Sequence, residues 1–131
     1  MGLIEKISNE KAGFHPVVVK DCWQVIKVNY SQQNELDKID SLIRNGNNAL
    51  ALCLLTGRAV LLIQNSEKNA VSLKAITMVR GSSYVIPENV GYNIAMEKGC
   101  QLFAVESPYN RTENVRKIPL TNAELEVIKK M

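Results

Sequence analysis

Short apolar runs separated by polar turns fill most of this 131-residue chain. Several runs alternate apolar and polar positions, which is typical of strands with one buried face. The turns recur roughly every eight to twelve residues, too close together for intervening helices. We therefore expect antiparallel strands and an all-β fold. The predicted strands are residues 17–19, 23–28, 49–55, 59–63, 71–79, 84–86, 92–96 and 101–106.

Two connections have the composition of tight turns. Thr56-Gly57-Arg58 joins the apolar runs 49–55 and 59–63, and a glycine tolerates the positive φ that a two-residue turn requires. This pattern predicts a hairpin between those two strands. Residues 65–69 are all polar and predict a second turn before 71–79.

Two segments have helical features. Thr121 and Glu124 have the spacing of a capping box, and Leu125 and Ile128 follow on one face. These residues predict a short C-terminal helix packed on the outside of the sheet. Residues 34–44 also carry apolar side chains at helical spacing, and for this segment both helix and strand stay open.

Composition indicates one globular domain spanning residues 1–131. The hydrophobic share is 46%, the charged share is 22% and the formal net charge is +3. The sixteen Lys and Arg residues are scattered and only 5% of residues are aromatic, so we expect no nucleic-acid binding. No apolar run approaches the roughly 20 residues that span a bilayer, so we expect no membrane insertion.

Three cysteines, Cys22, Cys53 and Cys100, are too far apart to form a Cys-x-x-Cys pair. An odd number of widely spaced cysteines is typical of free thiols in a reducing compartment. The first residues also lack the layout of a signal peptide. We therefore expect a cytoplasmic protein.

A glycine-anchored motif lies in the second half of the chain: Gly81, then Pro87, Asn89 and Tyr92. With strands on both sides, it resembles the second motif of the cupin superfamily, which ends in a histidine where this chain has Tyr92. The first cupin motif ends in a glycine that Gly57 matches. The resemblance covers about residues 23–106 and implies a double-stranded β-helix, or jelly-roll barrel, with its core at about 17–107. It also implies that the end of 34–44 is a strand.

The same comparison implies that the metal site of the family is missing here. Asn45, Leu50 and Tyr92 stand at positions where cupins carry histidine or glutamate, and none of these side chains is a good ligand for a transition metal. The only histidine, His15, precedes the barrel. We therefore expect no metal and no other cofactor.

Strand alternation within such a barrel directs a second set of side chains inward. The candidate pocket residues are Asn45, Leu50, Leu52, Tyr92 and Ile94. These residues could line an apolar pocket in which Asn45 and Tyr92 are the two polar groups that contact a small-molecule ligand. Alternatively, their side chains simply fill the barrel. We favour the filled barrel.

Three kinds of function follow. The favoured one is a non-catalytic barrel that binds a small molecule or a partner chain. The alternative is a metal-free isomerase, epimerase or lyase acting on a sugar or carboxylic acid, with Tyr92, Lys27 or His15 as acid–base candidates. An inward carboxylate would favour this enzyme, and the pattern shows none. The third is an assembly subunit that uses the apolar runs 17–19 and 61–63. We expect a homodimer under each.

Overall fold

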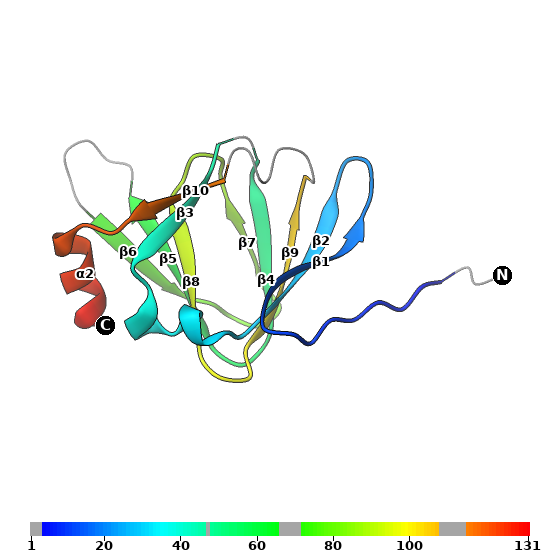
Figure 1. Ribbon diagram of the computed structural model, residues 1–131, viewed down its shortest axis with the longest axis horizontal. Helices are drawn as coiled ribbons and strands as arrows, with labels where there is room; N and C mark the ends of the chain where they lie inside the picture. Colours follow the sequence, from blue (N-terminus) through cyan, green and yellow to red (C-terminus); the bar gives the residue numbers. More distant parts are fainter. Residues whose placement is uncertain (1–3, 47, 66–71, 108–114) are drawn as a thin grey trace.

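The computed structural model describes residues 4–46, 48–65, 72–107 and 115–131, which form two five-stranded antiparallel sheets (Figure 1). The all-β prediction is confirmed. The first sheet has the order β1 (Gly13–Val19), β2 (Gln24–Asn29), β9 (Gln101–Glu106), β4 (Leu50–Thr56), β7 (Ser83–Ile86). The second has the order β10 (Val115–Pro119), β3 (Ser41–Asn45), β8 (Tyr92–Met96), β5 (Ala59–Asn65), β6 (Ser72–Thr77).

The predicted hairpin at Gly57 is wrong. Strand β4 pairs with β7 and β9, whereas β5 pairs with β6 and β8, so the turn carries the chain from one sheet to the other. The positive φ expected at this glycine is present, and a close approach of the neighbouring backbone is a second reason for it. Its φ is +80°, and a Cβ there would lie 2.7 Å from the Cα of Cys100. The chain crosses between the sheets where only a glycine fits against the neighbouring turn.

The end of segment 34–44 is a strand, as the resemblance implies, and the helical alternative is wrong. Two short 3₁₀ turns, η1 (Gln32–Asn34) and η2 (Leu36–Lys38), lead into β3. Leu42 and Ile43 lie on opposite faces of β3. Leu42 belongs to the outer apolar layer, and Ile43 packs against the barrel core. Because both faces of this sheet are covered, consecutive apolar residues imitate a helical pattern.

Two apolar layers hold the structure together. The main core fills the space between the sheets and includes Leu52, Ile94 and Leu102, which are almost fully buried. The second layer lies between the outer face of the second sheet and helix α2 (Asn122–Lys129), where Ile128 is buried. Figure 1 shows α2 on the outer side of this sheet, far from β1 and β2.

The C-terminal helix begins as predicted. The Thr121 hydroxyl accepts a hydrogen bond from the Glu124 amide at 3.1 Å, and the Glu124 carboxylate accepts one from the Thr121 amide at 2.9 Å. This reciprocal pair satisfies two amides that the first helical turn leaves open.

One strand was not predicted. Strand β10 pairs antiparallel with β3 along its whole length. Together with β1, which begins at Gly13, it extends the sheets beyond residues 17–107. The predicted turn at 65–69 lies largely outside the described residues. Within the described residues no helix is long and apolar enough to cross a membrane.

Candidate functional site

Four polar side chains gather inside one end of the barrel. At this end β3 and β9 finish, and β2 and β8 begin. Each side chain belongs to a residue that is at most 7% exposed. We call this set the polar cluster; its members are Gln24, Asn45, Tyr92 and Glu106.

Strand register brings two of its members into contact. Gln24 of β2 lies directly opposite Glu106 of β9. The Gln24 Nε2 donates a hydrogen bond to Glu106 Oε1 at 3.1 Å. An amide donor therefore holds the buried carboxylate in place, as burial of a charged group demands.

Asn45 ties the surrounding turns together. Its side-chain Oδ1 accepts a hydrogen bond from the Asn48 amide at 3.1 Å, which closes the connection from β3 toward β4. Its backbone oxygen accepts one from the Asn89 amide at 2.7 Å. Asn89 itself has a φ of 65°, a conformation that asparagine tolerates better than most residues. The turn after β7 is thus fastened to the end of β3.

The structure brings the predicted pocket residues together. Asn45, Leu50 and Tyr92 line one space with Glu106, while Leu52 and Ile94 lie in the apolar core. That space does not admit a water-sized molecule. This barrel end is filled in the described conformation, and the role of these residues in binding stays a prediction.

Gln24 and Glu106 are the cluster residues that the sequence reasoning missed, and Glu106 is the more informative of the two. On β9 the buried positions are Leu102, Ala104 and Glu106, so the carboxylate shares the inward face of the strand with two core residues. The alternation along 101–106 was the available signal. An inward carboxylate is the feature that favours a metal-free enzyme over a passive barrel.

The donor set does not fit the transition-metal site that cupins carry. The cluster offers one carboxylate, one phenol and two amides, and no imidazole. Within the described residues, no group of three or more histidine, cysteine, aspartate or glutamate side chains is close enough to hold a metal ion. The cluster is instead suited to hydrogen bonding and to proton transfer between Tyr92 and Glu106 through a bound ligand.

The other two acid–base candidates lie away from the cluster. Lys27 is on the outer face of β2, covered by the N-terminal segment, with its Nζ 3.6 Å from the Glu10 carboxylate. The His15 Nε2 lies 2.7 Å from the backbone oxygen of Ala12. Of the three candidates named from the sequence, only Tyr92 faces the barrel interior.

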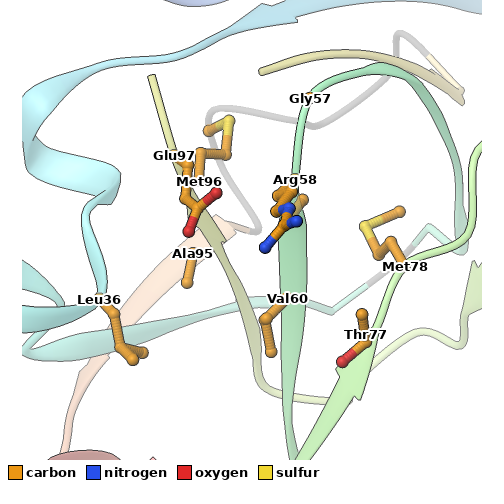
Figure 2. A pocket seen from close by; sticks show the side chains of 10 residues that line it. Leu36, Gly57, Arg58, Val60, Thr77, Met78, Ala95, Met96 and Glu97 are labelled. Atoms are coloured by element: carbon orange, nitrogen blue, oxygen red, sulfur yellow. The ribbon is translucent and has the colours of Figure 1, made fainter. Parts of the chain in front are cut away.

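Larger hollows lie elsewhere, and two of them are described here. The first, shown in Figure 2, has a volume of about 510 Å³ and lies beside β5, β6 and β8, with mostly apolar walls. Arg58 and Glu97 are its charged residues. The second, about 540 Å³, opens between β1 and β3 and is lined by Phe14, Asn93 and Lys117 among others. No predicted pocket residue lines either hollow.

Comparison with solved structures defines the class of fold. The two facing antiparallel sheets, with crossing connections and a covered outer face, form a cupin-like β-barrel, and the resemblance read from the sequence is confirmed at the level of fold. No known family model and no curated protein sequence matches the chain.

The particular structures that share this fold include an enzyme. Pac13, described as a unique nucleoside dehydratase, superposes with a TM-score of 0.57 at 11% identity, covering 89% of this chain and 87% of Pac13. A Streptomyces Pac13 variant with a replaced histidine, solved with uridine, gives 0.58 at 14% identity, covering 89% of this chain and 87% of that one. An RmlC-like cupin from Shewanella frigidimarina gives 0.53 at 13% identity, covering 86% of this chain and 91% of that one. Identities this low show the fold alone.

Proposed function

We propose that this protein binds a small polar molecule at the polar cluster, without a metal ion. One observation carries the proposal: a carboxylate, a phenol and two amides are buried at one end of an otherwise apolar barrel. Burying a charged group costs free energy, and apolar residues of similar volume would close the barrel without that cost. Polar groups kept inside a barrel are therefore candidates for recognition of a ligand.

The chemistry of the cluster favours a neutral ligand rich in hydroxyl or amide groups. Gln24 and Asn45 can each donate and accept hydrogen bonds, and Tyr92 can do both through one hydroxyl. The Glu106 carboxylate accepts hydrogen bonds and repels anions. Sugars and nucleosides meet these requirements. The fold shared with a nucleoside dehydratase supports the inclusion of nucleosides among the ligands to be tested.

A ligand needs space that the described conformation does not provide. The turn after β7 closes this end through the bond between the Asn89 amide and the Asn45 backbone oxygen. We expect this turn to move when a ligand binds, since its displacement breaks a single backbone hydrogen bond at this contact. That bond contributes about 1 kcal/mol net, a small cost for a binding event.

A metal-free isomerase, epimerase or lyase is the second candidate, and Glu106 is the observation that favours it. Tyr92 and Glu106 line the same space, so a bound sugar or carboxylic acid would contact a general acid and a general base together. Proton abstraction by Glu106 and proton donation by Tyr92 would then serve an isomerisation or a dehydration.

The test is a thermal-shift screen of the whole chain against nucleosides including uridine, neutral sugars and organic acids. We expect at least one nucleoside or sugar to raise Tm, and Tyr92→Phe and Glu106→Gln to abolish the rise. The matched controls are Tyr84→Phe, whose hydroxyl bonds the Val79 amide outside the cluster, and Glu126→Gln, on the exposed face of α2. Both controls should keep the rise.

Three outcomes would refute the proposal. The first is that no compound of the panel changes Tm, and the second is that a rise in Tm persists in both cluster variants. The third is that only Lys117→Gln, in the hollow between β1 and β3, removes the rise. Elemental analysis of the purified protein should find no stoichiometric metal. Incubating each binding compound with the protein and following it by NMR separates the two candidates, because only an enzyme converts the compound, and Glu106→Gln should stop that conversion.

A further inference from the structure

A hollow on the outer face of the second sheet is a separate candidate binding site. Its floor is a cross-strand row in which Val60 of β5 lies opposite Thr77 of β6 on one side and Ala95 of β8 on the other. The neighbours of Val60 along β5, Ala59 and Leu61, belong to the main core, so this row faces away from the barrel. We call the space above the row the outer hollow (Figure 2). Its lining includes Leu36, Arg58, Val60, Thr77, Ala95 and Glu97.

The outer hollow continues the second apolar layer beyond helix α2. Under the helix, Leu62 and Leu73 are buried together with Ile128. Leu36 of η2 borders both spaces, because it lines the outer hollow and also the groove beside α2. The volume of the outer hollow, about 510 Å³, is within the usual range for small-molecule sites, about 300–1,000 Å³. Its mostly apolar walls suit a ligand with an apolar body.

The strands that form the floor are described along their whole length here. Asn65 and Ser72, where β5 and β6 leave the described residues, stand at the far ends of these strands. They are about 17 Å along the strand from Val60 and Thr77. The described residues therefore define this part of the outer face.

Two opposite charges lie at one end of the outer hollow. Arg58 precedes β5 and Glu97 follows β8, and the Glu97 amide donates a hydrogen bond to the Arg58 backbone oxygen at 3.1 Å. Figure 2 shows both side chains at the same end of the hollow. Both residues are exposed, and among the described residues neither the guanidinium nor the carboxylate has a hydrogen-bond or ion-pair partner. One positive and one negative group are thus available to a ligand.

We propose that the outer hollow binds a free α-amino acid with a large apolar side chain. Such a molecule carries a carboxylate and an ammonium group on one carbon atom, and paired residues on adjacent strands have Cβ atoms about 5 Å apart. The Arg58 guanidinium is suited to bind the carboxylate with two parallel hydrogen bonds, and the Glu97 carboxylate accepts hydrogen bonds from the ammonium group. The apolar side chain then covers Val60 and Ala95 and extends toward Leu36.

Other classes of ligand match the outer hollow less well. A fatty acid or an acidic peptide would bring a negative charge beside Glu97 without an ammonium group to balance it. A sugar or a nucleoside would place most of its polar groups against apolar walls. The outer hollow is also separate from the polar cluster, since Tyr92 begins β8 and faces the core, whereas Ala95 lies near the other end of β8 and faces outward. The inference therefore does not depend on the ligand proposed above.

The test is a titration of the whole chain, labelled with ¹⁵N, with L-leucine and L-phenylalanine, followed by two-dimensional ¹H–¹⁵N NMR. We expect saturable shifts of the Val60 and Ala95 amide signals, with a Kd of about 1 mM or tighter. N-acetyl-L-leucine lacks the ammonium group and L-leucinamide lacks the carboxylate, so each should bind about fivefold more weakly than L-leucine. Glycine, which has no apolar side chain, should cause no saturable shift.

Variants test each charged residue separately. Arg58→Gln and Glu97→Gln should each raise the Kd for L-leucine about fivefold. Arg58→Gln should also bind L-leucine and L-leucinamide equally, and Glu97→Gln should bind L-leucine and N-acetyl-L-leucine equally, which a merely structural role would not produce. The matched controls are Arg80→Gln and Glu88→Gln, at exposed residues that do not line the outer hollow, and both should keep the wild-type Kd.

Each of three other results overturns the proposal. The first is that neither amino acid gives a saturable shift at roughly 10 mM. The second is that L-leucine and its two blocked analogues bind the wild type equally, because the charges would then play no part. The third is that Glu106→Gln abolishes binding, which would place the amino acid in the polar cluster. Because Arg58 and Glu97 are exposed, their variants should fold normally, and the same NMR spectra check this directly.

Discussion

Replacing Gly57 by alanine tests the account of the crossing between the sheets. Gly57 and Gly81 have similar φ angles, +80° and +87°, so alanine is strained at both positions. The strain of a left-handed conformation is about 1–2 kcal/mol, reduced by about 0.4–1 kcal/mol because alanine also restricts the unfolded chain. The added Cβ meets nothing within 4 Å at Gly81, but lies 2.7 Å from the Cys100 Cα at Gly57. Two backbone segments must then separate, at about 1–3 kcal/mol more.

We therefore expect Gly81→Ala to lower the free energy of unfolding by about 1 kcal/mol and Gly57→Ala by about 3 kcal/mol. Urea unfolding followed by far-UV circular dichroism measures both values under the same conditions. Gly99→Ala is a second control, since Gly99 has a φ of +85° and open space around its Cα. Equal losses at Gly57 and Gly81 would refute the reasoning, because the contact with Cys100 would then cost nothing.

Three further predictions concern the cap, the core and a buried thiol. Thr121→Ala removes the acceptor for the Glu124 amide and should cost about 1 kcal/mol in urea unfolding, while Thr121→Ser should cost little; equal losses would argue against the cap. Ile94→Ala should cost about 2–5 kcal/mol and Ile94→Val about 0.5–1.5 kcal/mol, and a small loss for alanine would mean that the core is loosely packed. Burial, with a smaller effect of the nearby Glu97 carboxylate, raises the pKa of the Cys100 thiol from 9.0 to about 11, so the folded state holds this proton more tightly. Relative to Cys100→Ala, the wild type should lose stability between about pH 9 and pH 11, and a parallel pH profile for the two proteins would contradict this.

Local patterns in the sequence were sufficient to predict those elements that depend on residues close together in the chain. The strand 101–106 matches β9, and the capping box at Thr121 forms as expected. Pairing between strands depends on residues far apart, and there the prediction failed. The turn at Gly57 has the composition of a hairpin, but its flanking strands find better partners in opposite sheets.

Strand β10 was missed because its sequence carries a weak signal. Arg116 and Lys117 interrupt its apolar residues, and it ends in Pro119. Charged residues and proline are common on edge strands, where one side of the backbone makes no ladder. This strand lies at the edge of the second sheet and is defined by its pairing with β3.

Two of the four residues of the polar cluster could be predicted from the sequence, and the other two depend on strand pairing. Asn45 and Tyr92 could be placed together because two glycine-anchored motifs fix their positions relative to Gly57 and Gly81. Gln24 and Glu106 belong to no motif, and they meet only through the register between β2 and β9. Each stands at the end of its strand, where the pattern alone does not say whether the alternation of inward and outward positions continues.

The register also explains how a barrel end without histidines can keep a buried carboxylate. Glu106 is 4% exposed, so its Oε1 needs a donor close by, and the amide of Gln24 is 3.1 Å away. In a metal-binding barrel the ion can balance such a carboxylate. Here the hydrogen bond from Gln24 on the adjacent strand helps to stabilise the carboxylate. The space beside Glu106 is lined by the amide of Asn45 and the phenol of Tyr92. The side chains at this barrel end thus form a buried polar site whose groups are suited to hydrogen bonding and proton transfer.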